Sequence, residues 1–368
     1  MKKILMGSTA CIGLGLIAGP AVADEPISLG LGGYFHGYGV FGEDDGVLGA
    51  NRRNYKISRE SEVHFKGSTS LDNGLKVGIK IELEAETCPD QIDETYMYVE
   101  GGFGRLLVGQ EDPAPYVMYM GAPSSALPGH GFTVPTFQHA QTGGNAHGAI
   151  PTNLINISGD SEKLSYFSPR LGGFQLGVSY TPENCEERLG TCAGTYGGFP
   201  STQDGGQQSE VVEIGANYTR KLGGIDFSLF GGYGEGDLEV PAAGATDQTE
   251  WSVGLRVGVL GLEVGASYHE DNLATSGSNS DQEEVLVGGS YGTGPWKLSL
   301  LYWHSRIGAG AGLGADTLDA IELGARYTLG PGVRLAGGVQ YLELQDNLNV
   351  AANENEALIF ILGTSVSF

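Results

Sequence analysis

The chain has 368 residues, 62 of which are glycine, and carries a formal net charge of −24 from 44 acidic and 20 basic side chains. Glycine destabilises helices, so this composition disfavours a mostly helical protein. Nucleic-acid binding is excluded because it requires lysine and arginine side chains to neutralise phosphates. What remains is a β-rich protein, long enough for one large domain or two ordinary ones.

The first 23 residues predict an export signal. Lys2 and Lys3 precede an apolar run from Ile4 to Ile17, and Ala21-Val22-Ala23 supplies small residues at the cleavage position. A membrane anchor is the alternative, but the run is shorter than the roughly 20 residues that a spanning helix needs. We therefore expect residues 1–23 to be a cleaved signal peptide and residues 24–368 to form one β-barrel domain.

Past the signal, short stretches alternate strictly between apolar and polar residues. Phe174, Leu176, Val178 and Tyr180 lie on one face of a strand, for example, with small or polar residues between them. The same pattern recurs at 212–218, 251–257, 262–269, 321–328 and 358–368. We expect one apolar face and one face of Gly, Ser, Glu, Arg and Lys on every strand.

Tight turns and long polar segments alternate between these strands. We expect short turns at 71–74, 101–104, 170–173, 221–224, 260–261, 292–295 and 329–332. The long loops are expected at 42–53, 85–91, 111–159, 183–209, 235–249, 271–281, 305–317 and 345–355. Seven turns interleaved with eight loops connect sixteen antiparallel strands.

The aromatic residues decide between a soluble sandwich and a transmembrane barrel. Tyrosines end the strands at both edges of the apolar band, as in Tyr180, Tyr233 and Tyr302 at one edge and Tyr218 and Tyr291 at the other. Such girdles are typical of lipid interfaces, and a sandwich has no reason to form them. The sequence therefore predicts an all-β, sixteen-stranded antiparallel outer-membrane barrel whose apolar side chains face lipid, with an aqueous lumen and no conventional core.

Several segments resemble the alphaproteobacterial general porins. They are Glu60–Gly67 with the turn Leu71–Leu75, Ile92–Arg105 continuing to Asp112, Tyr166–Tyr180, and the final residue Phe368. The resemblance implies a homotrimer in the cell outer membrane of a Gram-negative bacterium, surrounded by lipopolysaccharide. It further implies a long third loop that folds inward to narrow the pore, and a terminal aromatic that serves as the signal for the barrel-assembly machinery.

The longest loop, 111–159, follows the fifth strand and matches the family's third loop. In the family, carboxylates of that loop face a basic wall. The residues expected at the constriction are Glu111, Asp112, Tyr116, Lys56, Lys76, Lys80 and Arg105. The middle of the loop is poor in acids, so Tyr116, Met118 and Met120 are the alternative, less polar lining. The alternative for the lysines is that they pair with glutamates on neighbouring strands, among them Glu60, Glu62, Glu82 and Glu84.

Cysteine and acidic residues add three smaller expectations. Cys185 and Cys192 are candidates for a disulfide, which leaves Cys88 unpaired. No cofactor or metal centre is expected, because no Cys or His spacing is typical of one. Acidic clusters in the loops, such as Glu43-Asp44-Asp45, would either bind divalent cations such as calcium or form a solvated rim. Arg59 falls on the lipid-facing parity, which indicates a subunit contact or a bulge.

Two functions follow from these features. The first is passive diffusion of small hydrophilic solutes and ions, with a preference for cations. The second is a substrate-specific channel or receptor in which Tyr116, Tyr119, Phe132 and Phe137 form an aromatic binding track. An enzyme is not expected, since the sequence contains no nucleophile elbow, zincin or P-loop motif.

Overall fold

The computed structural model describes residues 26–44, 53–85, 91–123, 126–127, 154–184, 208–240, 242–276, 280–310, 313–348, 350 and 353–368. Within these residues, no helix is long and apolar enough to cross a membrane. The signal-peptide prediction lies outside them.

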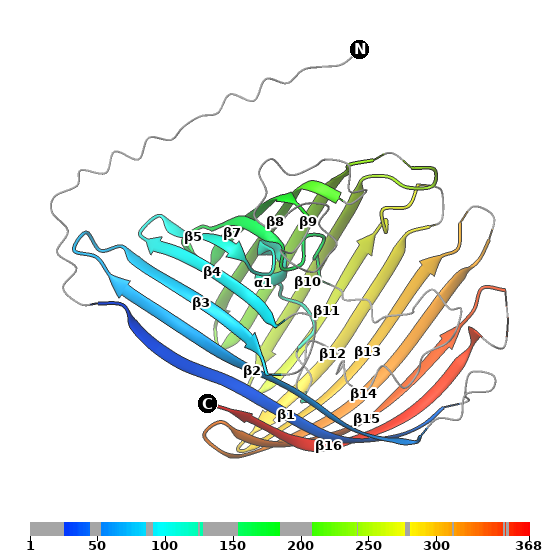
Figure 1. Ribbon diagram of the computed structural model, residues 1–368. Coiled ribbons are helices and arrows are strands. Elements are labelled where there is room, and N and C mark those ends of the chain that lie inside the picture. The colour runs from blue at the N-terminus through cyan, green and yellow to red at the C-terminus, as the bar shows by residue number, and fades with distance from the viewer. Residues whose placement is uncertain are drawn as a thin grey trace.

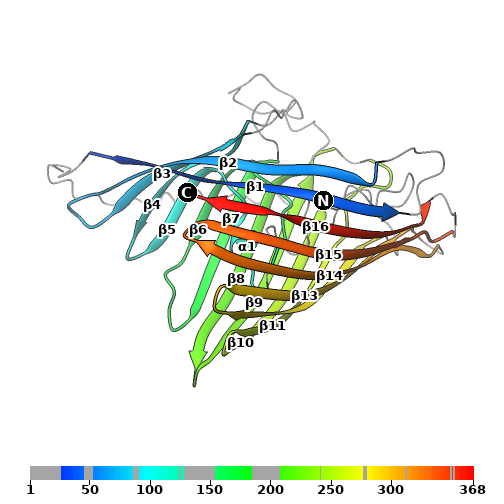
Figure 2. The same cartoon turned by 90° about the horizontal axis from the view of Figure 1, so that it is seen from below.

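Sixteen antiparallel strands close into one barrel, as predicted (Figures 1 and 2). Each strand pairs with its neighbours in the sequence, and β1 pairs with β16. The strands are β1 (Ser28–Asp44), β2 (Tyr55–Ser70), β3 (Lys76–Glu84), β4 (Ile92–Gly101), β5 (Gly104–Gln110), β6 (Glu162–Phe167), β7 (Phe174–Glu183), β8 (Gln208–Leu222), β9 (Ile225–Leu238), β10 (Gln248–Val259), β11 (Leu262–Asp271), β12 (Gln282–Thr293), β13 (Trp296–Gly308), β14 (Ala315–Gly330), β15 (Val333–Gln345) and β16 (Asn355–Ser367). The predicted short turns all lie at one end of the barrel, which we call the short-turn end, and the other end is the long-loop end.

The last residue of the chain completes the closure. The Phe368 N–H donates to Gly33 O, and the Gly33 N–H donates to Phe368 O, each at 3.1 Å. Pairing every strand edge matters in a membrane because lipid offers no partner for an unpaired N–H or C=O group.

The outward face is apolar and carries tyrosines toward the long-loop end. Four of these tyrosines donate their hydroxyls to carboxylates on the same outer surface: Tyr180 to Glu210, Tyr233 to Glu235 at 2.9 Å, Tyr268 to Glu270 at 3.0 Å, and Tyr302 to Asp319 at 2.6 Å. Each ring can therefore lie against hydrocarbon while its hydroxyl meets the polar interface, as an aromatic girdle requires.

The inward face differs from the prediction on one side of the barrel. Buried apolar side chains line β12–β16 and β1 on the inside, including Leu301, Trp303, Leu318, Leu342 and Ile359. Ile359 is fully buried while its neighbour Phe360 is 50% exposed on the outside, so both faces of β16 are apolar. The expectation of a polar inner face on every strand, without a core, is therefore wrong here. The unbroken apolar run 357–362 was the signal in the sequence, because strands covered on both faces lose their alternation.

The barrel wall has uneven height. β5 and β6 have seven and six residues, whereas β13, β14 and β15 have 13, 16 and 13. A spanning strand needs about 9–11 residues, so the wall around β5 and β6 is too short to cross the hydrocarbon by itself.

Candidate functional site

A segment after β5 runs along the inside of the barrel. It starts at Glu111, contains the four-residue helix α1 (Ala114–Val117), and is described as far as Leu127 apart from residues 124–125. Inward-facing side chains from five strands bind it: Ser179 of β7, Asn217 of β8, Arg256 of β10, Ser267 of β11 and Ser299 of β13. This segment is the start of the third long connection, and it follows the inner wall through roughly half of the strands.

Glycines on the inner wall make room for this segment. Gly177, Gly215 and Gly232 lie in one register row across β7, β8 and β9. A β-carbon added at Gly215 would lie 2.8 Å from Pro115 Cα, closer than van der Waals contact allows. At Gly177 it would collide with the Met118 sulfur. These lumenal glycines therefore form the surface of the inner wall against which α1 packs. This close packing explains part of the glycine excess.

The returning arm of the same connection, residues 154–161, is fixed to the wall by buried acids. The Ile157 N–H donates to Glu213 of β8 at 3.0 Å, and the Asn156 N–H donates to Glu250 of β10 at 3.0 Å. Lys163 of β6 joins the two arms because its ammonium donates to the carbonyl oxygens of Glu111 and, at 2.6 Å, Gly159. Both arms are therefore held independently of residues 128–153.

An acidic wall occupies the inner faces of β2, β3 and β4 beside the segment. We call Glu60, Glu62, His64, Lys80, Glu82 and Glu94 the acidic wall. Lys80 pairs with Glu82 of its own strand and with Glu94 of β4 at 2.9 Å, while His64 Nε2 lies 2.7 Å from Glu62. Glu62, Glu82 and Glu94 thus share one lysine and one histidine, while Glu60 lies 3.9 Å from His36 Nδ1 of β1. Carboxylates outnumber cations, so the wall keeps excess negative charge.

Tyr96 of β4 brings together three of the predicted constriction residues. Its ring lies 5.6 Å from Lys80 Nζ and 5.6 Å from the Arg105 guanidinium carbon, and Arg105 Nη2 donates to its hydroxyl at 3.5 Å. Glu111 interacts with the same hydroxyl. The predicted pairing of a lysine with neighbouring glutamates is found at Lys80.

The other two predicted lysines lie apart from this group. Lys56 is near the long-loop end of β2, opposite Val40, whereas Lys76 is the first residue of β3 at the short-turn end. Lys76 Nζ lies 5.8 Å from the Tyr98 ring centre. Lys56, Lys76 and Lys80 therefore occupy three different heights in the lumen.

Asp112 and Tyr116 lie at the start of the inward segment and are largely buried. Burial, and then the nearby carboxylates of Asp160, Glu94 and Glu111, raise the pKa of Asp112 to about 9. Burial, and then Glu94, raise the pKa of Glu111 to about 7. Burial also raises the pKa of Tyr116. The charge at the entrance of the segment therefore depends on pH near neutrality.

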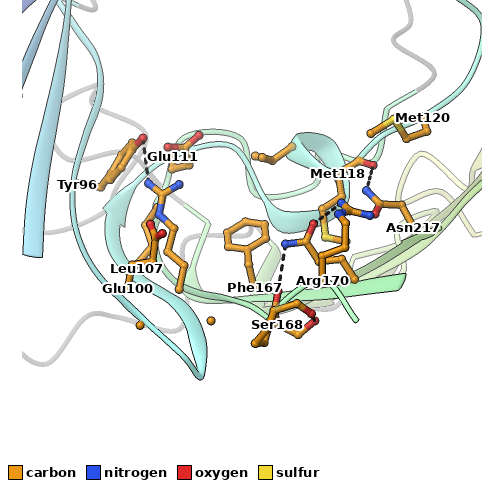
Figure 3. A pocket seen from close by; sticks show the side chains of 16 residues that line it. Tyr96, Glu100, Leu107, Glu111, Met118, Met120, Phe167, Ser168, Arg170 and Asn217 are labelled. Atoms are coloured by element: carbon orange, nitrogen blue, oxygen red, sulfur yellow. Dashed lines mark hydrogen bonds between the residues drawn. The ribbon is translucent and has the colours of Figure 1, made fainter. Parts of the chain in front are cut away.

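A cavity of about 580 Å³ lies between the inward segment and the wall (Figure 3). Tyr96 and Glu111 lie on one side of it, next to Arg105, and Met118, Met120 and Arg170 lie on the other (Figure 3). A polar and a thioether surface therefore border the same open space, with Arg105 and Glu111 from the predicted polar lining and Met118 and Met120 from the alternative one. Tyr119, by contrast, donates its hydroxyl to Ser267 at 2.6 Å and packs edge-on against Phe230, so its ring is part of the attachment to the wall.

Sequence reasoning missed the residues that hold the segment. Ser179, Glu213, Asn217, Glu250 and Arg256 are all on the inward parity that the alternation identifies, but nothing local marks them as attachment points. Arg59 is exposed and donates to Ala85 O at 3.4 Å, and the β1–β2 register is unbroken there, so the bulge interpretation is wrong.

Several other predictions fall outside the described residues: Cys88, Cys185, Cys192, Phe132 and Phe137. The described part of the chain contains three groups of side chains whose ligand atoms lie within 4.8 Å of one another, of which Glu94, Asp112 and Asp160 are one. They lie in the lumen rather than in the outer loops where divalent cations are expected.

Comparisons with known proteins agree with this architecture. The model of the Gram-negative porin family matches residues 7–347. No curated protein sequence matches the chain.

Solved structures share the fold at low sequence identity. A porin refined at 1.8 Å resolution has a TM-score of 0.61 and 16% identity, covering 93% of this chain and all of that one. The trimer form of OmpT from Vibrio cholerae has a TM-score of 0.60 and 15% identity over 94% and 100% of the two chains. An anion-selective porin from Comamonas acidovorans has a TM-score of 0.59 and 15% identity over 93% and 100%.

Proposed function

We propose, from the premise that this chain belongs to the Gram-negative porin family and forms a pore in the outer membrane, that it is a general diffusion channel with a cation-preferring constriction. The short-turn end then faces the periplasm and the long-loop end faces the exterior. The observation that carries the proposal is the acidic wall, which stands beside Glu111 and Asp112 where the inward segment narrows the lumen. Fixed negative charge at the narrowest level attracts cations and repels anions.

Passive diffusion also agrees with the attachment of the third connection to the barrel wall. Tyr119 is bonded to the wall, and both arms of the loop are fixed by buried partners. A fixed constriction sorts solutes by size and charge without a binding step. The substrate-specific alternative needs aromatic faces open to the lumen. Of the two predicted track residues that the structure describes, Tyr119 packs against the wall and Tyr116 is partly buried in α1.

We further propose a homotrimer whose subunits contact one another through the part of the barrel wall formed by the short strands β5 and β6. β5 and β6 are too short to span, so another copy covers that face. Arg59, exposed on β2, is a candidate for a further subunit contact. The similar Vibrio cholerae structure is a trimer, which supports this arrangement. Residues 1–23 would be removed on export, and Phe368 would be read by the assembly machinery. A protein that lacks Phe368 should therefore reach the membrane in lower yield.

Conductance of the purified protein in planar bilayers tests the proposed function. We expect open channels whose current rises linearly with salt, and reversal potentials in a KCl gradient that show preference for K⁺. A preference for Cl⁻ would contradict the cation-preferring constriction. Saturable block by a neutral sugar would favour the substrate-specific channel, and the absence of any conductance would refute both functions.

A further inference from the structure

Three basic side chains lie together on the inner face of β13, β14 and β15, close to the short turns. Lys297 is directly opposite Arg326 in the β13–β14 register. Arg334 is two residues before Ala336, the residue opposite Arg326 on β15. Side chains directly opposite each other have Cβ atoms about 5 Å apart, and diagonal ones about 7–8 Å. All three are half-buried and share the inward parity of Ser299, Gly324 and Ala336.

No described residue neutralises these cations. None of the three forms an ion pair within 4.0 Å or a hydrogen bond with any part of the chain that the structure describes. Glu263 acts on Lys297 from a greater distance, and one of its carboxylate oxygens accepts a hydrogen bond from Ser290 at 3.2 Å. Like charges placed directly opposite each other destabilise a sheet, so the fold tolerates a cost at this point.

A buried hydroxyl without a partner lies in the same register row. Tyr38 of β1 is opposite Gly363, Gly363 is opposite Ala336, and Ala336 is opposite Arg326. The Tyr38 ring lies over Gly363, because a β-carbon there would collide with it. Tyr38 is 97% buried, and its hydroxyl has no hydrogen-bond partner among the described residues. The Glu60 carboxylate acts on it electrostatically, and Arg326 acts on it less strongly.

Arg256 of β10 provides the contrast within the same half of the barrel. It also acts on Lys297, but its guanidinium donates to the carbonyl oxygens of Gly121 and Ala122 at 3.0 and 2.9 Å. Its charge is therefore used to hold the inward segment. Lys297, Arg326 and Arg334 hold nothing that the structure describes.

We propose that Lys297, Arg326, Arg334 and the Tyr38 hydroxyl form a binding site for small solutes that carry an oxyanion, either a phosphate or a carboxylate. Four donor groups converge on one wall without an acceptor, and guanidinium forks match the two oxygens of these anions. Gly363 and Ala336, the wall residues between Tyr38 and Arg326, are both small, and the Tyr38 ring covers Gly363. The inference rests on the proposed function, since it names a solute class that the channel would hold at its periplasmic half.

Lys297 and Arg334 lie one residue from the short-turn ends of β13 and β15, whereas Glu82 and Glu94 of the acidic wall lie six and seven residues from the short-turn ends of β3 and β4. An anion that enters from the periplasm reaches the basic site before it reaches the acidic constriction. The channel then conducts cations preferentially and still retains oxyanions at its inner mouth.

Phosphate block of single channels tests the site. Wild-type protein in planar bilayers is exposed to inorganic phosphate, or to succinate in a second arm, added on the side of the short turns at constant KCl. We expect concentration-dependent interruptions of the current, with a half-blocking concentration at least tenfold higher in the double variant K297Q/R326Q. Y38F, which removes only the hydroxyl, should raise it severalfold. R220Q removes an exposed, outward-facing arginine at the same end and should leave the half-blocking concentration unchanged.

Phosphorus NMR of the detergent-solubilised protein gives a readout that does not need conductance. Line broadening of phosphate by wild type, reduced in K297Q/R326Q and in R334Q, is expected. Block by either oxyanion supports the site, and the stronger of the two identifies the solute class. Equal block and equal broadening in wild type and variants would overturn the proposal. A preference for Cl⁻ in the KCl gradient would instead contradict the cation-preferring constriction. The oxyanion site would then be judged from the phosphate block and the line broadening alone.

Discussion

Two walls of the same lumen treat charge in opposite ways. On β2–β4, carboxylates outnumber cations, yet Lys80 and His64 each lie between two of them, and the side chains form a connected network. On β13–β15, Lys297, Arg326 and Arg334 lie next to one another without an ion pair within 4.0 Å among the described residues, and Glu263 acts on Lys297 only from a greater distance.

The difference separates charges that support the fold from charges that are available to a solute. A buried ion pair is costly to break because the remaining partner stays desolvated and unneutralised. An unpaired cation facing an aqueous lumen repels its neighbours, so its removal relieves strain. Substitutions on the two walls should therefore change stability in opposite directions.

The largest effect is expected for Lys80→Gln. It leaves Glu82 and Glu94, both largely buried, without their shared counter-ion. The barrel should be destabilised by about 2–3 kcal/mol, slightly less than a fully buried broken pair costs, because the lumen holds water. Thermal unfolding in detergent measures this. Lys221→Gln is the matched control, because its pair with Asp226 is exposed and should contribute under about 1 kcal/mol. Equal effects of the two substitutions would contradict the role given to the network.

Displacing the inward segment from the inner wall should widen the pore. Gly215→Val places a side chain where Pro115 lies, so α1 must move away from the inner wall. We therefore expect a larger single-channel conductance. Gly231→Val serves as the control, since a β-carbon there meets nothing within 4 Å. Unchanged conductance of Gly215→Val would show that the segment does not limit the pore.

The selectivity of the constriction should depend on pH. The pKa of Glu111 is raised to about 7 and that of Asp112 to about 9, so both carboxyls lose their protons as the pH increases from 6 to 10. The negative charge beside the acidic wall then increases, and the preference for K⁺ over Cl⁻ should increase with it. Reversal potentials at pH 6 and pH 9 measure the change. Asp112→Asn should reduce this pH-dependent change. A preference for K⁺ that decreases as the pH increases would contradict the prediction.

The smallest effect is expected on the basic wall. Arg326→Gln removes a like charge opposite Lys297 and should leave stability unchanged or raise it by about 0.5 kcal/mol. Thermal unfolding alongside Lys80→Gln measures both in one experiment. A loss of more than about 1 kcal/mol would mean that Arg326 supports the fold after all.

Alternation and turn spacing were enough to predict the barrel, its strand number and the position of the long third connection. A two-residue period reports directly which side chains share a face, and Gly-rich turns mark where strands end. Both signals are local. The same alternation placed Lys80 and Arg105 on the inner face, where the structure finds them.

The attachment of the loop and the contrast between the walls were not predictable in this way. Glu213 and Ile157 are 56 positions apart, and Lys297 meets Arg326 only because of the β13–β14 register. Parity gives the face of a residue but not its height or its neighbours. The apolar inner face of β16 was missed for a related reason. Without alternation, the sequence of a strand does not show which side chains face inward.

The two-point attachment of the third connection has a consequence for engineering. Leu127 is buried against β15 at one end, and Leu154 to Ser161 lie against β8 and β10 at the other. The sequence between them can then be exchanged for peptides of different length or chemistry while the barrel and both anchors keep their places. Such chimeras would give a series of pores that differ in one aperture, as a sensor for single molecules requires.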